Sequence, residues 1–269
     1  MNCRICQKKA GSLFTARIFN KHDGHFSYCE SCEHIFADDP TWLDEAYSDA
    51  TAATDTDTAT RNILTALRLS AICYFGLKNK GQGIYADVAG GYGLLTRLMR
   101  DLGFNYFWSD MYAKNLFARG FEYHANHGAC EAVSAIEALE HTQNPFQFIQ
   151  EALAQHKTDT FIFTTETFPQ NTPPESNQWG YYSFDTGQHI AFFSPLGLSK
   201  LAHRLNMEYF PLGRIHVFSK KPLSIRRLKL VSNKFLVVPL ALFALFSLGS
   251  RRGTDQTIVK KAMLGTPHA

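Results

Sequence analysis

The alternation of strand-like and helix-like segments between residues 84 and 219 constrains the fold most strongly. A short buried strand, "IYADV", begins at Ile84, and the helical segment "LLTRLMRDL" follows it, with inward leucines expected at Leu94, Leu95, Leu98 and Leu102. Further strand-like segments are "FNYFWSD", "EAVSAIE" and "TFIFTTE", and the segments "PFQFIQEALAQH" and "SPLGLSKLAHRL" have helical periods. This alternation predicts a parallel sheet with helices on both faces, and the late candidates "MEYF" and "RIHVFS" predict an antiparallel edge.

The sequence divides into four predicted parts. Residues 1–40 form a small separate unit, 41–60 a connector, 61–219 the α/β core and 220–269 a tail. The connector ends in "TAATDTDTAT", which has neither a helical nor a strand period and is typical of a loop. A helix is expected to begin near Arg61, with an apolar face formed by Leu64, Leu67, Ala71, Ile72 and Phe75.

A glycine-rich loop follows the first core strand. Gly90, Gly91 and Gly93 lie directly before a helix, where backbone can come close to a ligand. A dinucleotide loop would need a glycine or alanine at the position that Thr96 occupies. A Walker A loop would need a lysine after the glycines, but the next lysine is Lys114. Neither nucleotide-loop pattern matches this sequence, although the start of a helix would still suit an anion.

Of two aspartates beside this loop, Asp87 indicates a different cofactor, whereas Asp110 suits any cofactor with a ribose. Asp87 ends the strand before the glycines, and its carboxylate would repel a pyrophosphate but attract a cation. S-adenosylmethionine carries a sulfonium and an ammonium group and no phosphate. Asp110 ends the next strand, at about the 20-residue spacing from which an acid accepts hydrogen bonds from ribose hydroxyls. The sequence therefore favours S-adenosylmethionine over NAD.

Three segments, in order along the chain, resemble class I S-adenosylmethionine-dependent methyltransferases. "DVAGGYG" is similar to their D-x-G-x-G-x-G loop, and "SAIEALEHTQNPFQFIQEAL" to their fourth-strand motif. "GQHIAFFSPLGLSKLA" is similar to a segment of a subgroup that includes sugar methyltransferases, several of which carry an N-terminal zinc unit. The resemblance covers about Met1 to Ser219 and implies a Rossmann-like, doubly wound fold. Ala89 departs from it, because the family usually has glycine there, and a methyl group would crowd the cofactor if φ were positive.

This resemblance implies a set of site residues. The cofactor would be held by Asp87, Ala89, Gly90, Gly91, Gly93, Asp110, Met111, Glu137 and Arg61. Candidates for chemistry are His189 as the base, followed by Glu140 and His141. The aromatic residues Trp179, Tyr181 and Tyr182 lie in a long segment that is a candidate acceptor pocket. Structural alternatives stay open: His189 could cap a loop, Glu140 and His141 could pin a strand end, and the aromatic rings could pack the segment onto the sheet.

Two matched cysteine pairs predict a metal site in residues 1–40. Cys3 and Cys6 form one C-x-x-C pair, and Cys29 and Cys32 form the other. Four thiolates suit a closed tetrahedral zinc site of structural type, and a hairpin turning at "NKHDG" would bring the pairs together. The alternative is four reduced cysteines or a redox pair. Cys73 and Cys130 are expected to be core thiols.

The tail is basic and contains an apolar run. From Pro211 onward there are eleven Lys and Arg residues and one acid, Asp255, which gives this segment a net charge of +10. Because the whole chain has a net charge of +3, residues 1–210 carry 3 − 10 = −7. The fourteen-residue run "FLVVPLALFALFSL" would extend about 21 Å as a helix, less than the ~30 Å core of a bilayer, and Pro239 interrupts it. It is expected either to pack as a core or dimer helix or to lie at an anionic membrane surface.

The function predicted from these features is methylation, at oxygen or carbon, of a sugar, nucleotide-sugar or surface-glycan precursor. One alternative is an RNA-modifying methyltransferase, although "EALEH" stands where base-amine methyltransferases usually have Asn/Asp-Pro-Pro-Tyr, so nucleic acid is not the expected partner. The other is a non-catalytic zinc-ribbon protein with a degenerate fold. The start of the chain, "MNCRICQKKAGS", lacks an apolar segment, and with six cysteines this favours the cytoplasm, with the tail allowing contact with the inner membrane face.

Overall fold

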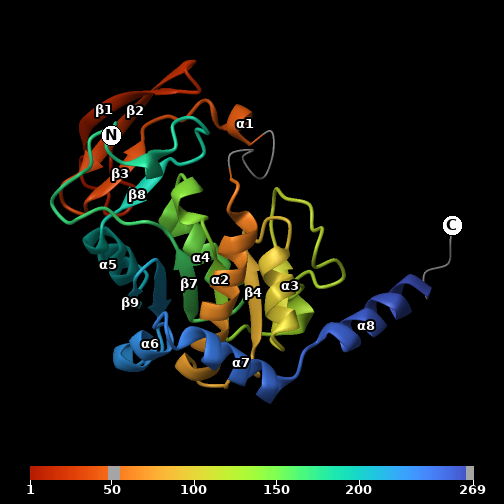
Figure 1. The fold of residues 1–269 in the computed structure, drawn as a ribbon. Helices are drawn as coiled ribbons and strands as arrows, with labels where there is room; N and C mark the ends of the chain where they lie inside the picture. The colour runs from red at the N-terminus through yellow and green to blue at the C-terminus, as the bar shows by residue number, and fades with distance from the viewer. Residues whose placement is uncertain (48–54, 265–269) are drawn as a thin grey trace. The chain divides into compact units, whose positions relative to one another are not determined.

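The computed structural model describes residues 1–47 and 55–264 and consists of two compact units (Figure 1). The first unit combines Met1–Thr56 with Ser134–Pro222, and the second combines Asp57–Val133 with Leu223–Ala269. Residues 48–54, part of the predicted connector, lie outside the described residues. The rest of that connector is not all loop: helix α1 covers Leu43–Ala46, and helix α2 already begins at Thr58.

A small antiparallel sheet lies in the first unit (Figure 1). Its order is β1-β2-β3-β8, and the strands are β1 (Gly11–Ile18), β2 (His22–Cys29), β3 (His34–Ala37) and β8 (Ala191–Phe193). The predicted hairpin forms, but it turns at Phe19–Lys21, where Phe19 and Asn20 have positive φ, and not at the Asp-Gly pair. Asp23 instead pairs with Arg17 inside the ladder.

Residues 1–40 are therefore not a separate unit as predicted. Strand β3 pairs with β8, which comes from more than 150 positions later in the chain, so the sheet is completed by the α/β part. A shared apolar core joins the two segments, and its members include Ile18, Phe26, Ile35, Trp42, Phe168, Tyr182, Ile190 and Phe192. The indole N–H of Trp42 donates to the Gly187 carbonyl at 2.8 Å, which ties the start of the connector to the same segment.

The rest of the first unit contains strands and helices of the predicted core. The elements are α4 (Pro145–Gln155), β7 (Thr160–Thr164), α5 (Pro195–Arg204), β9 (Glu208–Leu212) and β10 (Ile215–Ser219). Strand β10 pairs antiparallel with both β7 and β9, which confirms the antiparallel edge. Both helices begin with proline, and the side chains of Asn144 and Ser194 cap them by accepting from backbone N–H groups.

The second unit contains the glycine loop. Strands β4 (Ile84–Val88) and β5 (Asn105–Ser109) pair in parallel, and helices α2 (Thr58–Ala71) and α3 (Leu94–Asp101) pack against each other. The predicted helix faces are only partly correct. Leu64 is exposed and Leu94, Leu98 and Leu102 are half-buried, whereas α3 buries Leu95, Thr96, Met99 and Arg100. A single π-helical turn, Ile72–Gly76, follows α2.

The larger sheet has the strand order β5-β4-β6-β7-β10-β9, with β6 covering Ala132–Ala135. The strand numbers do not run consecutively across it, so the chain crosses over between strands as a doubly wound α/β fold requires. The predicted fold class, an α/β sheet with helices and a small additional sheet at the N-terminus, is confirmed.

The tail is helical. It forms α6 (Ile225–Val231), α7 (Val237–Leu248) and α8 (Arg252–Leu264). Pro239 does not interrupt α7, because it lies in the first turn, where a backbone N–H would have no helical partner. Among the described residues, no helix is long and apolar enough to cross a bilayer.

A buried ion pair holds α8 on α3. The Asp255 carboxylate accepts from Arg100 at 2.7 and 2.8 Å and from Arg97 at 2.8 Å. Arg100 and Asp255 are 2% and 3% exposed, and the Arg100 guanidinium also stacks over the Phe121 ring at 3.7 Å. Burial opposes the ionisation of Asp255, but the hydrogen bonds from Arg100 and Arg97 outweigh it and hold the pKa of Asp255 below its usual value.

We expect Asp255→Asn to lower the free energy of unfolding by about 3–5 kcal/mol, because it leaves the buried Arg100 charge without its counter-ion. Asp101→Asn is the matched control, since Asp101 pairs with the same Arg97 in a more exposed position, where such a pair contributes about 0.5 kcal/mol. Urea unfolding measures both values. Equal losses for the two variants would contradict the role assigned to Asp255.

Candidate functional site

The backbone of the glycine loop turns sharply after β4. Ala89, Gly91 and Gly93 all have positive φ, at 58°, 52° and 85°. The Gly93 N–H donates to the Gly90 carbonyl at 2.9 Å, which closes the turn before α3. Ala89 thus adopts the conformation in which its methyl group was expected to crowd a ligand, at the position where the family usually has glycine.

Steric contacts explain two of the glycines, and the third is open. A Cβ at Gly93 would lie 2.7 Å from the Asn115 side-chain oxygen. One at Gly90 would lie 2.9 Å from the Trp108 ring and 3.1 Å from a carboxylate oxygen of Asp87. A Cβ at Gly91 would meet nothing within 4 Å among the described residues, so the loop is open at this position. Asp87 itself is only 2% exposed.

Asp110 holds the loop against the end of β5. One carboxylate oxygen accepts from the Gly91 N–H at 2.9 Å, and the other accepts from the N–H groups of Tyr112 and Ala113 at 2.7 Å. Each carboxylate oxygen has two acceptor sites, so the oxygen bonded to Gly91 keeps one for a ligand hydroxyl. Met111, next to it, is 89% exposed. The predicted pair of loop and acid is thus brought together by a direct hydrogen bond.

Arg61 lies in the first turns of α2. Its guanidinium pairs with Asp57 at 2.8 Å, one helical turn earlier, and its side chain is 29% exposed. The predicted interaction with a cofactor carboxylate is therefore in competition with this local ion pair.

A cluster of titratable side chains lies in the first unit. Glu140, His141 and His189 place one donor atom each within 4.8 Å of one another. The rings of His141 and His189 meet edge to face with centroids 4.9 Å apart. A 3₁₀ turn at Leu139–His141 positions the first two residues, and the Ile190 N–H donates to the Glu140 carbonyl at 2.8 Å, which fixes His189 beside them.

Glu140 is fully buried, and burial raises the pKa of its carboxyl to about 8, with the nearby charge of Glu137 adding to the shift. Neither carboxyl oxygen has a hydrogen bond within the described part of the chain. The hydroxyls of Tyr181 and Thr165 lie nearby and lower the pKa in part, and they bond each other at 3.2 Å. Glu140 is therefore protonated at neutral pH.

The two histidines have defined ring orientations. His189 Nδ1 lies 2.6 Å from the Tyr181 carbonyl, which can only accept, so a neutral His189 carries its proton on Nδ1. The lone pair of the ring is then on Nε2, as a general base needs. His141 Nδ1 bonds the Tyr47 hydroxyl at 2.9 Å. Sequence reasoning missed Tyr47 and Thr165, because neither belongs to a motif.

Glu137 lies at the end of β6 in a strained backbone conformation. Its φ is 48°, and its N–H donates to the Thr164 hydroxyl at 2.8 Å. A non-glycine residue at positive φ is uncommon, and such residues gather at functional sites, which agrees with the predicted role without testing it.

The three predicted acceptor aromatics have different surroundings. Tyr182 is 1% exposed, lies in the apolar core and donates its hydroxyl to the Pro174 carbonyl, as the packing alternative expects. The Trp179 indole N–H donates to Glu166 at 3.1 Å, and its ring contacts Tyr181 with centroids 5.2 Å apart. The Tyr181 ring lies 4.7 Å from that of His189. Trp179 and Tyr181 thus remain candidates beside the cluster, whereas Tyr182 does not.

The four cysteines of the matched pairs come together in the first unit. Their sulfurs lie within 4.8 Å of one another, and three pairs are separated by 3.4, 3.5 and 3.6 Å. Sulfurs about 2.3 Å from a zinc ion at the corners of a tetrahedron would be about 3.8 Å apart. Hydrogen bonding from Cys32 lowers the pKa of Cys3 to about 3, whereas burial raises the pKa of Cys29 to about 11. The donor set fits a tetrahedral cation, whose charge would allow all four thiolates.

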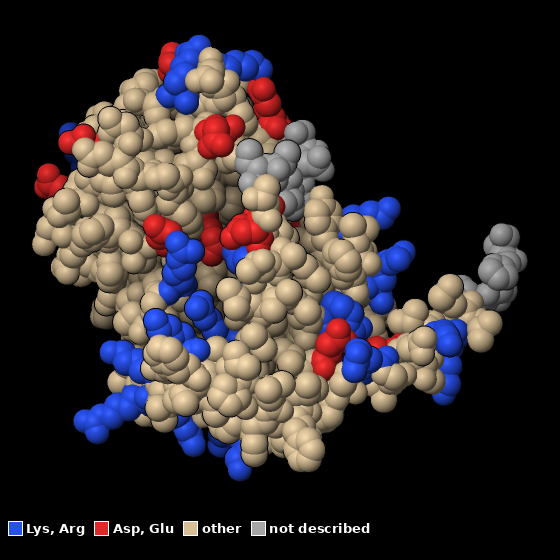
Figure 2. Space-filling view, in the orientation of Figure 1, with Lys and Arg blue, Asp and Glu red and all other residues tan. Residues whose placement is uncertain are grey.

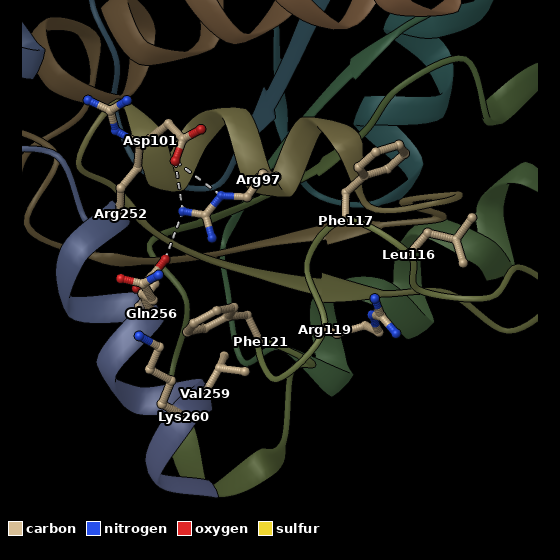
Figure 3. A pocket seen from close by; sticks show the side chains of 11 residues that line it. Arg97, Asp101, Leu116, Phe117, Arg119, Phe121, Arg252, Gln256, Val259 and Lys260 are labelled. Carbon is tan, nitrogen blue, oxygen red and sulfur yellow. Dashed lines mark hydrogen bonds and ion pairs between the residues drawn. The ribbon is translucent and has the colours of Figure 1, made fainter. Parts of the chain in front are cut away.

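A separate cleft of about 480 Å³ lies between α3 and α8 (Figure 3). Its lining residues include Arg97, Asp101, Phe121 and Arg252. None of the predicted site residues lines it, so it is not the candidate site.

Comparison with protein families gives one match. A family model described as a methyltransferase domain matches residues 61–211, more than half of the 269 residues. No curated protein matches the chain.

Several solved structures are distantly similar. Mitomycin 7-O-methyltransferase MmcR has 10% identity and a TM-score of 0.44 over 66% of this chain and 59% of its own. Magnesium protoporphyrin IX methyltransferase from Synechocystis PCC 6803 with bound SAH has 13% identity and a TM-score of 0.41, over 66% and 93%. TnmH has 12% identity and a TM-score of 0.46, over 68% and 62%. The chain thus spans less than two thirds of the first and third of these structures.

The buried Glu140 makes stability depend on pH. Its pKa is about 8 in the folded chain, above the value of 4.5 for a free side chain, so the folded state holds one more proton between these values. We expect the free energy of unfolding to fall as pH rises from about 5 to 8, by about 1.4 kcal/mol per pH unit from this group. Urea unfolding of Glu140→Gln should lack this part of the slope, and an unchanged slope would contradict the assignment.

Proposed function

The chain belongs to the methyltransferase domain family, and from this premise we propose that it transfers a methyl group from S-adenosylmethionine to a sugar or glycan precursor. One observation carries the cofactor part of the proposal. The open glycine loop is bonded to Asp110 and lies beside the buried carboxylate of Asp87, which would repel a diphosphate.

Residues of the second unit would hold most of the cofactor. The N-terminal end of α3, which follows the loop, suits its carboxylate, and Asp87 suits its cationic groups. The free acceptor site of Asp110 suits a ribose hydroxyl, and the exposed Met111 offers apolar surface for a base. The resemblance alone assigns Ala89, Glu137 and Arg61 to the same ligand. S-adenosylmethionine would supply an electrophilic methyl group on a sulfonium sulfur.

His189 is the proposed general base. Its Nδ1–H donates to the Tyr181 carbonyl, which holds the ring and places the lone pair on Nε2, the atom that would take a proton from an acceptor hydroxyl or carbon acid. His141 would orient the ring of His189 through their edge-to-face contact. Because Glu140 is neutral at pH 7, it does not stabilise the protonated form of His189 before the reaction. Ionisation of Glu140 would stabilise the His189 imidazolium once the acceptor proton has moved to it.

The proposed acceptor class rests on the rings of Trp179 and Tyr181. They lie close to His189 and to each other, and sugar rings pack well against aromatic faces. The Trp179 indole is also held by Glu166, whose carboxylate bonds Arg214 at 2.7 Å, so polar groups surround the aromatic pair. Such a mixture of apolar faces and hydrogen-bonding groups suits a polyhydroxylated acceptor.

We also propose that Cys3, Cys6, Cys29 and Cys32 bind one structural zinc ion. The sulfur separations and the burial of three of the four thiols support it. All four positions of a tetrahedron would be filled by protein, so the ion would stabilise the small sheet and take no part in methyl transfer.

The test of the cofactor proposal is calorimetric titration. We expect the intact chain to bind S-adenosylmethionine and its demethylated product, and not NAD. Asp110→Ala should weaken binding at least tenfold, because a charge-assisted hydrogen bond contributes about 1.5–3 kcal/mol and the loop also loses its anchor. Asp101→Ala, outside the loop, should bind as the unsubstituted chain does. Absence of heat with both ligands would refute the proposal.

For the zinc proposal, elemental analysis of protein purified without chelator should give one zinc per chain. Cys29→Ser should lose the ion, whereas Cys130→Ala, at a buried thiol far from the cluster in sequence, should keep it. Because β3 pairs with β8 and shares an apolar core, we expect proteolysis of Cys29→Ser to begin at the two C-x-x-C turns and not throughout residues 1–40. A metal-free chain with intact stability would contradict a structural zinc.

A further inference from the structure

Helix α7 is apolar on two faces, and the described part of the chain covers one of them. Val237, Ala241 and Ala244 are buried, and α7 packs against α2 on this side (Figure 1). Their small side chains allow the two helices to approach closely. The core-packing alternative for this segment is thus correct for one face only.

The other face of α7 is an exposed apolar stripe. Within the helix its residues are Val238, Leu242, Phe243 and Phe246, with exposed fractions of 47%, 56%, 55% and 91%. Phe235, just before the helix, continues the stripe and is 78% exposed. No polar side chain occurs from residue 235 to residue 246. A contiguous exposed surface of this kind marks an interaction site.

Basic residues surround the apolar stripe. Figure 2 shows Lys and Arg side chains over α6 and along α8, with uncharged surface over α7. The exposed cations of this segment are Arg226, Arg227, Lys229, Lys234, Arg252, Lys260 and Lys261. The one acid of the tail, Asp255, is buried in its ion pair with Arg100 and cannot offset them at the surface.

The length of α7 and the absence of polar side chains from its exposed stripe identify the kind of partner. Its twelve residues extend about 18 Å, which is too short to span a bilayer but suits a helix lying in the plane of the interface. A protein partner would be expected to find about one hydrogen bond per 100–200 Å², and this stripe offers none from its side chains. The surrounding cations complement an anionic surface.

We propose that the exposed stripe of α7 inserts into the surface of an anionic membrane, with the surrounding Lys and Arg at the level of the lipid phosphates. An interfacial helix normally needs a polar face toward water. In α7 the side opposite the exposed stripe packs against α2 and not against water, so it needs no polar residues. The proposal concerns where the protein acts and stands apart from the proposed methyl transfer.

Sedimentation with vesicles tests the proposal on the full chain. We expect binding to vesicles that contain phosphatidylglycerol, weaker binding to pure phosphatidylcholine, and release as salt is raised, because screening weakens the contribution of the cations. The variant Arg226→Gln/Arg227→Gln/Lys229→Gln should bind about a hundredfold more weakly, since each cation near the surface contributes about fivefold. The control Lys8→Gln/Arg17→Gln/Lys157→Gln removes as many exposed cations from other elements and should bind almost as before.

A second variant tests insertion apart from charge. Val238→Ser/Leu242→Ser/Phe246→Ser changes only exposed side chains and leaves the ring contacts of Phe243 with Tyr74 and Phe75 in place, so it should fold normally by circular dichroism and lose vesicle binding at low salt. Leu116→Ser/Phe117→Ser, a comparably exposed apolar pair after β5, is the control and should bind normally.

Three results would overturn the proposal. The intact chain could fail to bind anionic vesicles at low salt, or the α7 triple variant could bind them as well as the intact chain. Light scattering could also show that the intact chain is a dimer and the triple variant a monomer, while the intact chain does not bind vesicles. In that last case the stripe is a subunit interface.

Discussion

The carboxylate of Asp110 is the contact on which the candidate cofactor site depends. It accepts three backbone N–H groups, one from the glycine loop and two from the residues after β5. The loop is also held by the Gly93 N–H on the Gly90 carbonyl, by the Gly90 N–H on the Ser109 carbonyl and by the Trp108 indole N–H on the Gly91 carbonyl, and Asp110 supplies the partner of the Gly91 N–H. One side chain therefore positions the loop and also faces the site where a ribose would be bound. A residue with both roles cannot be replaced without changing the loop and the affinity together.

Two buried carboxyl groups of this chain, those of Asp255 and Glu140, differ in their protonation state. Asp255 stays ionised, because two arginines donate three hydrogen bonds to it, and these outweigh the cost of burial. Among the described residues no cation donates to Glu140, so burial raises its pKa and it keeps its proton at neutral pH. The first arrangement fixes α8 to α3. The Glu140 carboxyl lies next to His141 and His189, so a change in its charge would change the proton affinity of His189, the proposed base.

Local patterns predicted the parts of the structure that depend on neighbouring residues. The strand–loop–helix around Asp87, the hairpin and the cysteine cluster each follow from spacing within a few residues or from a repeated pair. Contacts between distant residues could not be predicted in this way. Arg100 is buried on α3 because Asp255, 155 residues later, supplies its counter-ion. Likewise, β3 gains its neighbour β8 from a remote segment, so the boundary at residue 40 was wrong as a structural division.

The tail shows why a run of apolar residues is ambiguous in a sequence. A periodic pattern reveals a helix face only when the other face differs from it, and "FLVVPLALFALFSL" has no polar face to compare. What distinguishes its two faces is side-chain size: Val237, Ala241 and Ala244 are buried, whereas Phe235 and Phe246 are largely exposed. Large aromatic residues would fill a protein core more readily than a water-exposed surface, since each removes 150–250 Å² of area from water when buried. Exposed aromatic rings beside a group of Lys and Arg side chains are therefore the feature of this tail that indicates a partner. An anionic membrane surface would bury the apolar rings and also bind the basic side chains.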